Sequence, residues 1–339
     1  MIDNKKINCV GVTGIKVYDR IYGEEEINEQ VLIDLINSKS IQRLKNISQF
    51  GMPDKYYHKK GFSRYEHSLG VLIFLRRIGA DLKEQIEGLI HDVSHTAFSH
   101  VIDWVVGDPS KEDYQDKAFG EIIKNSEIPE ILRKNGFDYT EFLNIENFSL
   151  LEQPIPNLCA DRFDYAIREI ADFESRENIE LIVRGVTQKD NKICFSSKEA
   201  AEIFSIGYIK CQNEHWGGRE AMARYYILAR ALKEAINKRI LSIEHFKMTD
   251  DDILSILENS KEENIINNLN LLKNGFLIKV SENSEGIKLN KKFRYIDPEV
   301  LVGNSLKRLS KVSRKYKSLL ENERLNHISK SIIKIEGLK

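Results

Sequence analysis

Five of the eight histidines in this 339-residue chain fall between positions 58 and 100: His58, His67, His91, His95 and His100. Burying several imidazoles costs free energy unless something pairs with them. A divalent metal ion is one such partner, because neutral imidazole is a common metal ligand. A histidine in a protein core is often held by ordinary hydrogen bonds instead, so the spacing alone leaves a metal site and a structural cluster both open.

Two carboxylates accompany these histidines. Asp92 follows His91 directly at the end of an apolar helical stretch, and Asp161 lies far downstream in another such stretch. Two imidazoles and two carboxylates form a mixed nitrogen and oxygen set, which suits Mn, Fe, Co, Ni or Zn better than Mg or Ca. An ion of this kind can lower the pKa of bound water and polarise a phosphoryl oxygen. The residue types therefore allow metal-assisted hydrolysis of a phosphoester.

Helices are expected to position these side chains. Residues 64–79 are apolar nearly all round, which predicts a buried helix that carries His67. Gly70 lies one turn beyond His67 and would let another helix or a ligand approach closely. A second helix over 82–92 ends at the histidine–aspartate pair, and helical spacing over 157–173 places the downstream aspartate on a third.

The rest of the chain also reads as mainly α. Other helices are predicted over 30–47, 112–134, 198–212, 218–239, 251–258 and 304–321. Extended structure is predicted over 16–27, 179–196, 276–280 and 287–295, with a hairpin turn at Lys189-Asp190-Asn191. We expect a helical core with a short N-terminal extended segment, a central β-hairpin and a small α+β C-terminal region. A soft boundary near 260–275 divides the chain into a domain of residues 1–260 and a region of residues 261–339.

Bulk composition is that of an ordinary soluble globular protein, with 41% hydrophobic and 30% charged residues. The net charge of -1 demands neither nucleic acid nor an anionic membrane as a partner. Four cysteines without CxxC spacing predict reduced thiols and a cytoplasmic location. No apolar run is long enough for a membrane helix. The segment 302–317 is basic and lacks acids, so it could bind nucleic acid, although such a helix face is usually solvated.

Several phrases of the sequence resemble one family. Residues 62–70 read FSRYEHSLG, residues 89–100 read LIHDVSHTAFSH and residues 161–165 read DRFDY. Upstream, 17–23 reads VYDRIYG and 49–51 reads QFG. Together they resemble the HD-domain superfamily of metal-dependent phosphohydrolases, most closely its deoxynucleoside triphosphate triphosphohydrolase (dGTPase-like) branch. The resemblance covers residues 16 to 170, half the chain, and implies an HD-type helical core.

The resemblance implies a metal centre and a catalytic group. The family's metal ligands match His67, His91, Asp92 and Asp161. Its catalytic residues match His95, His100 and Asp103. In this reading His95 contacts the phosphates or donates a proton, and Asp103 orients and polarises His100. The implied cofactor is a divalent transition metal (Mn, Fe, Co, Ni or Zn), which Mg could accompany.

The resemblance also implies a substrate pocket. Arg64 matches a phosphate-binding arginine, whose planar fork suits a pair of phosphate oxygens. Gln49 and Phe50 match residues that touch the sugar and base, and Tyr165 matches a tyrosine beside the sugar. As an alternative, Arg64 could pair with a neighbouring carboxylate in a purely structural network.

The chain departs from the triphosphohydrolase pattern in two places. An additional active-site histidine of that branch has no counterpart in residues 111–119, and the segment 213–219 does not align with its later tyrosine–histidine phrase. That segment contains His215 and Trp216 beside two glycines. It could form a base-stacking wall over the site or a buried turn between helices.

The resulting hypothesis is a metal-dependent hydrolase of nucleotides, with (deoxy)nucleoside triphosphates as the favoured substrates and a metal-activated water as the nucleophile. Alternatives within the family are hydrolysis of a nucleoside monophosphate, a cyclic nucleotide or an alarmone. A third hypothesis is a nucleotide- or nucleic-acid-binding regulator with a vestigial site, against which the complete ligand set argues. The resemblance further implies a homo-oligomer, and no membrane partner is expected.

Overall fold

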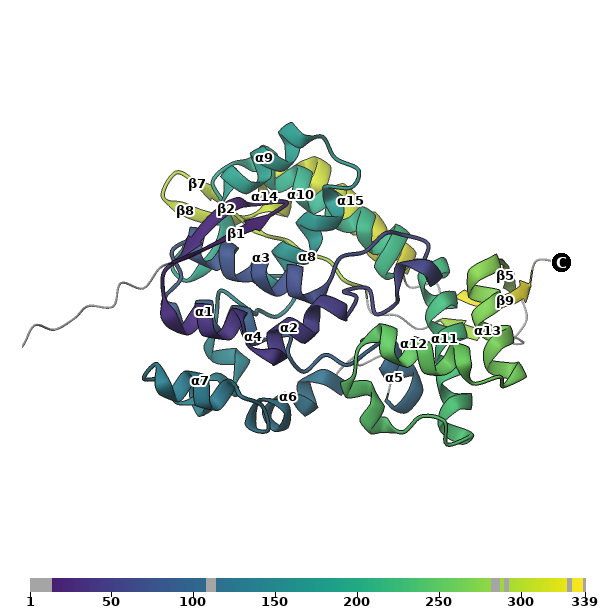
Figure 1. Ribbon diagram of the computed structural model, residues 1–339. Helices are drawn as coiled ribbons and strands as arrows, with labels where there is room; N and C mark the ends of the chain where they lie inside the picture. The colour runs from purple at the N-terminus through teal and green to yellow at the C-terminus, as the bar shows by residue number, and fades with distance from the viewer. Residues whose placement is uncertain (1–13, 108–113, 282–286, 290–292, 328–330, 338–339) are drawn as a thin grey trace, which may run out of the picture.

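Helices dominate the computed structural model, which describes residues 14–107, 114–281, 287–289, 293–327 and 331–337 (Figure 1). The prediction of a mainly α fold with a few small sheets is confirmed. Within the described residues, no helix is both long and apolar enough to cross a bilayer.

Three helices form the core that positions the site: α3 (Arg64–Arg77), α4 (Leu82–Ile90) and α8 (Ala160–Ile170). The α3 helix packs against both others, and Ser63 caps its N-terminus by accepting the N–H of Glu66. Its middle is buried on all sides, as predicted. Gly70 explains the close approach of α8, because a Cβ there would lie 1.9 Å from Nη2 of Arg168.

The N-terminal segment forms an antiparallel hairpin of β1 (Ile15–Asp19) and β2 (Gly23–Ile27) beside α3 (Figure 1). The helix predicted over 30–47 is divided into α1 (Gln30–Ile36), α2 (Lys39–Arg43) and the 3-10 helix η1 (Leu44–Asn46). The division occurs at Ser38, whose extended backbone interrupts α1 and whose hydroxyl caps α2 by accepting the N–H of Ile41.

Short helices flank the core pair α3 and α4. The 3-10 helix η2 (Asp54–Tyr56) precedes the pair. After it come α5 (Val101–Val106), α6 (Tyr114–Lys124), α7 (Ile128–Lys134) and the 3-10 helices η3 (Tyr139–Phe142) and η4 (Ile145–Asn147). The helix that ends at Ile90 does not continue, so the segment from His91 to His100 is a chain of turns. Phe98 and His100 adopt positive φ angles of 54° and 66° within it.

The central hairpin consists of β3 (Val186–Lys189) and β4 (Lys192–Phe195), and its turn at Asp190-Asn191 has positive φ at both residues. The turn was predicted, but the strand expected before residue 186 is wrong. That part is the end of α9 (Arg176–Gly185), which Ser175 caps by accepting the N–H of Asn178. Ile179 and Ile182 lie one turn apart on its buried side, a spacing that also fits a helix.

Long helices then lead to the C-terminal region. They are α10 (Lys198–Cys211), the π-helix η5 (Gln212–Trp216), α11 (Arg219–Asn237), the 3-10 helix η6 (Ile243–Lys247), α12 (Asp250–Asn259) and α13 (Glu263–Asn274). The soft boundary near 260–275 coincides with α13, which packs closely against α11. The two-part division of the chain stays a prediction.

The C-terminal strands enter two different sheets. One has the order β5-β9-β6 and is formed by Phe276–Ser281, Ser331–Gly337 and Ile287–Leu289. The other has the order β3-β4-β7-β8, in which β7 (Glu299–Val302) pairs with β4 in parallel and β8 is Ser305–Arg308. The C-terminal region therefore shares a sheet with the central hairpin.

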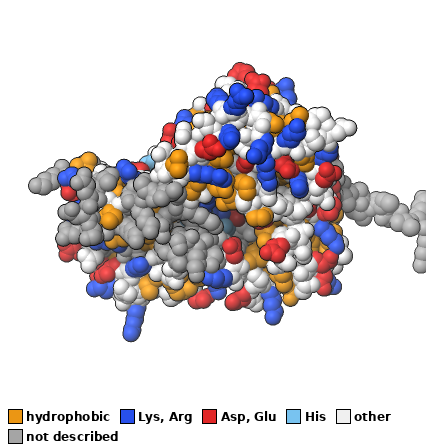
Figure 2. All heavy atoms as spheres, turned by 180° about the vertical axis from the view of Figure 1, so that it is seen from behind, with side chains coloured by type: hydrophobic (Ala, Val, Ile, Leu, Met, Phe, Trp, Pro, Cys, Tyr) orange, Lys and Arg blue, Asp and Glu red, His pale blue; other side chains and the backbone are white. Residues whose placement is uncertain are grey.

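The helix predicted over 304–321 is only partly correct. The chain first forms β8, after a turn in which Gly303 has a φ of 60°, and then α14 (Leu309–Val312) and α15 (Arg314–His327). The basic stretch 302–317 is consequently spread over a strand and two helices. On the face shown in Figure 2, Lys and Arg side chains gather over the upper part with Asp and Glu among them. Neither feature gives nucleic-acid binding further support.

Candidate metal centre and substrate pocket

The three core helices bring His67, His91 and Asp161 to one point. Their potential ligand atoms all lie within 4.8 Å of one another. Oδ1 of Asp161 is 3.1 Å from Nε2 of His67 and 3.7 Å from Nε2 of His91. Ligands bonded about 2.0–2.2 Å from one ion would lie roughly 3 Å apart, so the separations fit a shared metal.

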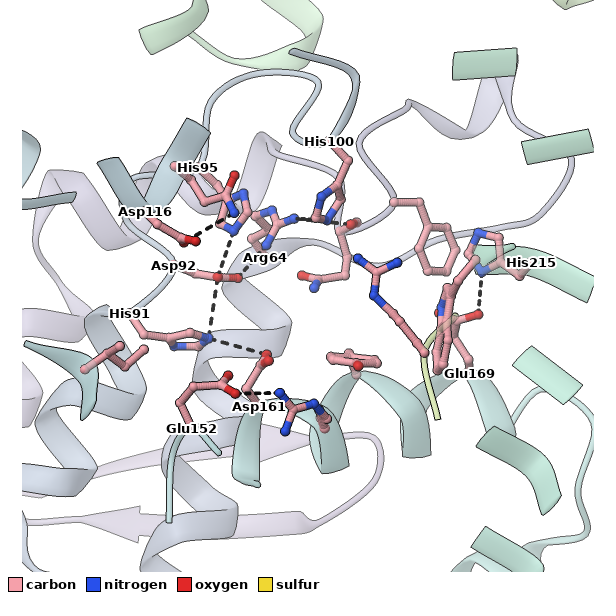
Figure 3. Close-up of a pocket in the computed structure, with 18 of the residues that line it drawn as sticks. Arg64, His91, Asp92, His95, His100, Asp116, Glu152, Asp161, Glu169 and His215 are labelled. Carbon is pink, nitrogen blue, oxygen red and sulfur yellow. Dashed lines mark hydrogen bonds and ion pairs between the residues drawn. The ribbon is translucent and has the colours of Figure 1, made fainter. Parts of the chain in front are cut away.

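Asp92 lies beside this group of three. Its Oδ2 is 3.8 Å from Nε2 of His67, and its Oδ1 is 3.5 Å from Nε2 of His91. The four predicted ligands thus converge from α3, the end of α4 and α8 (Figure 3).

Hydrogen bonds behind the two imidazoles aim them at this point. Nδ1 of His91 lies 2.8 Å from the carbonyl oxygen of Gly88, to which it donates, so Nε2 faces the cluster as an acceptor. That buried Nε2 has no hydrogen-bond partner among the residues that the structure describes, which is the state expected of a metal ligand. Nδ1 of His67 lies 2.8 Å from Oδ2 of Asp164, which orients that ring in the same way.

The electrostatics of the cluster also favour a cation. Burial opposes protonation of His67, yet the hydrogen bonds to Asp161 and Asp164 raise its pKa to about 9. The pKa of Asp161 is held below its ordinary value despite burial, because His67 lies within hydrogen-bond distance of the carboxylate and both neighbouring imidazoles, when protonated, stabilise its charge. Several acids around one buried point attract positive charge, and a divalent ion would satisfy them. The donor set, the spacing and the charge therefore fit a metal.

Arg64 lies beside these ligands and has only 1% of its surface exposed. Its Nη1 donates to Oδ2 of Asp92 at 2.7 Å, its Nε donates to Oγ of Ser99 at 2.9 Å, and Nη2 lies 3.2 Å from Nε2 of His100. The structural network considered as an alternative is therefore present. Binding of a phosphate by Arg64 stays a prediction.

The predicted catalytic histidines share one end of the pocket. The rings of His95 and His100 are 5.7 Å apart, and Nε2 of His95 lies 3.2 Å from Oδ1 of Asp92. Burial and the charge of Arg64 lower the pKa of His95 to about 4. Asp103 is fully buried on α5 and accepts the N–H of Tyr114 at 3.3 Å. Its orienting role toward His100 stays a prediction.

A cavity of about 310 Å³ runs from this cluster to an aromatic end. The four predicted substrate residues, Arg64, Gln49, Phe50 and Tyr165, all line it. Figure 3 shows His91, Asp92 and Asp161 at one side of the pocket and Glu169 and His215 at the other. The structure adds lining residues that the sequence prediction did not assign: Asp116, Glu152, Arg162, Glu169, Tyr225 and Arg294. His215 and Trp216, for which a base-stacking wall and a buried turn were both left open, also line the cavity.

The sequence contained a signal for some of the residues at this site. Asp161, Tyr165 and Glu169 follow each other at intervals of four on α8, so all three project from one helix face. Asp164 stood in the quoted DRFDY phrase and orients His67. Arg294 comes from a segment far away in the sequence, and Glu152 from the irregular segment before α8. Nothing local marks either of them as a pocket residue.

Asp250, at the start of α12, holds the loop that carries the predicted catalytic histidines. Its Oδ1 accepts the N–H of Phe98 and its Oδ2 accepts the N–H of Ser48, both at 2.8 Å. Its side chain is buried, so both bonds are made away from water.

Replacing Asp250 by asparagine should lower the free energy of unfolding by about 1–3 kcal/mol, because the amide group would oppose one of the two buried N–H donors. Turnover should fall as the loop loosens. Urea denaturation and kinetics check both effects, with Asp251→Asn as the matched exposed control in the same helical turn. Equal stability of the two variants would contradict the role of Asp250 in holding the loop.

Comparison with known proteins identifies the class. Residues 64–184 match the family model described as HD domain. The chain is 36% identical over 310 residues to the uncharacterized protein YdhJ of Bacillus subtilis, spanning 91% of this chain and 95% of that one. It is 34% identical over 230 residues to the metal-dependent phosphohydrolase cns2 of Cordyceps militaris, spanning 66% of each. It is 22% identical over 317 residues to the deoxynucleoside triphosphate triphosphohydrolase SAMHD1 homolog of Dictyostelium discoideum, spanning 76% of this chain and 57% of that one.

The fold, the site and these relatives define a metal-dependent phosphohydrolase. The chain belongs to the HD-domain superfamily, as its motifs predicted, and has triphosphohydrolases among its more distant relatives.

Proposed function

We propose that the protein hydrolyses nucleotides, with (deoxy)nucleoside triphosphates as the favoured substrates. The observation that carries the proposal is the shape of the pocket. One cavity joins the candidate metal ligands to an end lined by Phe50, Tyr165, Trp216 and Tyr225. A nucleotide has the same division, with a phosphate at one end and a flat apolar base at the other. The name of the triphosphohydrolase relative favours triphosphates.

In this proposal His67, His91, Asp92 and Asp161 hold a divalent transition metal (Mn, Fe, Co, Ni or Zn). When bound, such an ion supplies Lewis acidity that activates water and polarises a phosphoryl oxygen. His95 and His100 lie at the phosphate end, where they would hydrogen-bond phosphate oxygens or pass a proton to the leaving group. The aromatic residues would bind the nucleoside and exclude water. Assembly into a homo-oligomer stays a prediction.

A second candidate function is hydrolysis of a nucleotide with a single phosphate. It is favoured by the state of the two arginines beside the ligands. Arg64 is paired with Asp92 at 2.7 Å, and Arg162 is paired with Glu152 at 2.6 Å. Cations already committed to carboxylates contribute less to binding a highly charged triphosphate chain. The products separate the two candidates.

The deciding experiment is a metal-by-substrate screen. The protein is stripped with a chelator, reloaded with Mn, Fe(II), Co, Ni, Zn or Mg, and incubated with dNTPs, NTPs and nucleoside monophosphates, with His91→Ala as the blank. We expect metal-dependent formation of deoxynucleoside and tripolyphosphate that the blank lacks. Orthophosphate from monophosphates alone would favour the second candidate. Absence of turnover with every metal would contradict both.

A further inference from the structure

A π turn between α10 and α11 carries His215 and Trp216 into the pocket wall. Gly217 and Gly218 close this turn. A Cβ would lie 2.3 Å from Nε2 of Gln212 at the first glycine, and 2.8 Å from the carbonyl oxygen of Glu214 at the second. The two glycines are therefore needed for the chain to turn so tightly. π segments are frequent at functional sites.

Glu169 ties this turn to α8, two helical turns beyond Asp161. Nε1 of Trp216 donates to its Oε1 at 2.6 Å, and Nδ1 of His215 donates to its Oε2 at 2.5 Å. The hydroxyl of Tyr57 donates to Nε2 of His215 at 2.6 Å, with the ring as the Nδ1–H tautomer. Glu169 and His215 are only 2% and 1% exposed, so these bonds form away from water.

The same bonds fix which part of Trp216 faces the pocket. Its only polar group is used by Glu169, so the indole offers an apolar surface. The ring packs edge-to-face against Tyr165, with centroids 5.2 Å apart, and against Tyr208 at 4.8 Å. Tyr165 in turn lies 6.4 Å from the ring of His67. Tyr165 thus connects the candidate metal ligand His67 to Trp216 through ring contacts, and both Tyr165 and Trp216 line the cavity.

We propose that Glu169 is a positioning residue that fixes Trp216 as the surface on which the ring of the substrate stacks. The identity of that ring as a nucleobase rests on the proposed function, whereas the placement of Trp216 does not. Stacking of a base on an aromatic side chain changes affinity by roughly ten- to hundredfold, so the position of this indole affects substrate binding directly.

The placement is tested in the ligand-free protein. The chain has two tryptophans, so Trp104→Phe leaves Trp216 as the only indole reporter. In this background we expect Glu169→Ala to shift the Trp216 emission and to increase its quenching by acrylamide. Glu169→Gln should restore both, because the amide oxygen accepts from the indole and the amide N–H donates to His215 in its other tautomer. The matched control is Glu174→Ala, a glutamate just past α8 that bonds Asn178 at 2.7 Å.

Stacking is tested by titrating the same variants with dATP and with AMP in the presence of EDTA. We expect quenching of Trp216 in the parent, at least tenfold weaker binding in Glu169→Ala, and recovery to within a few-fold in Glu169→Gln. With metal present, KM for the hydrolysed nucleotide should rise by a similar factor in Glu169→Ala while kcat changes only a few-fold. If Glu169 served only the folding of the protein, the melting temperature would fall in both Glu169→Ala and Glu169→Gln, and Glu169→Gln would not recover nucleotide binding.

Unchanged emission and acrylamide quenching in Glu169→Ala would overturn the positioning role. Absence of nucleotide quenching in the parent would overturn the stacking role, even if Trp216 proved mobile in the variant. Failure of the proposed function has a different signature, in which dATP and AMP quench Trp216 but neither is hydrolysed with any metal.

Discussion

Replacing Asp161 by alanine is expected to reduce metal-dependent turnover by about a thousandfold and to abolish stabilisation of the fold by metal. Oδ1 of Asp161 lies 3.1 Å from Nε2 of His67 and 3.7 Å from Nε2 of His91. The nearer oxygen of Asp92 lies 3.8 Å from Nε2 of His67. Loss of Asp161 removes a negative ligand and the group that holds the two imidazoles at one point. Lewis-acid activation contributes several kcal/mol to catalysis, and each 1.4 kcal/mol is a factor of ten in rate.

Turnover and the shift of melting temperature on adding metal together show whether Asp161 serves the metal or the substrate. A metal that binds only the folded state at about 100 times its Kd adds roughly 2.7 kcal/mol of stability, so the wild-type melting temperature should rise with added metal. The Asp161→Ala variant should show no rise, whereas Asp172→Ala, an exposed aspartate just past the same helix, should behave as wild type. Lost activity with an intact thermal shift would mean that Asp161 serves the substrate rather than the metal.

The sequence predicted the metal end of the site better than the aromatic end, and the reason is physical. Metal ligands require particular residue types, and here they stand in short phrases with apolar helices around them, so His67, His91, Asp92 and Asp161 could be proposed together. The structure brings these four side chains together. An aromatic wall requires only a flat apolar surface, which any of 30 Phe, Tyr and Trp residues could supply. Only the fold determines which of them meet.

The sequence prediction was also wrong where the same spacing of residues fits both a helix and a strand. Ile179 and Ile182 fit a helix as well as an extended segment, and the cap at Ser175 decides for the helix. The basic stretch after residue 302 has helical spacing, but the turn at Gly303 and the pairing of β8 with β7 make its first part a strand. In both places the outcome depends on a capping bond or a partner strand that helical periodicity does not encode.

The buried ion-pair network behind the metal ligands links the stability of the fold to the geometry of the site. Arg168 is fully buried, and its Nη2 donates to Oδ2 of Asp19 at 2.6 Å. Its Nε donates to Oδ2 of Asp164 at 2.8 Å, and that oxygen also lies 2.8 Å from Nδ1 of His67. Arg168 thus neutralises the aspartate that orients a candidate metal ligand.

Replacing Arg168 by methionine should lower the free energy of unfolding by about 3–5 kcal/mol, because two buried carboxylates lose their counter-ion. Urea denaturation of the metal-free protein measures this effect. The control is Arg176→Met, which removes an exposed i,i+4 pair with Glu180 and should cost less than about 1 kcal/mol.

Arg168→Lys keeps the charge with fewer hydrogen bonds, so it remains measurable if the methionine variant does not fold. It should be destabilised by a smaller amount. Loss of an outer partner of a metal ligand typically weakens metal binding by about 10–100-fold, so a rise of that order in the metal concentration for half-maximal activity should accompany it. A lysine variant that is destabilised but binds metal as tightly as wild type would separate the fold from the site. Asp164 would then orient His67 without help from Arg168.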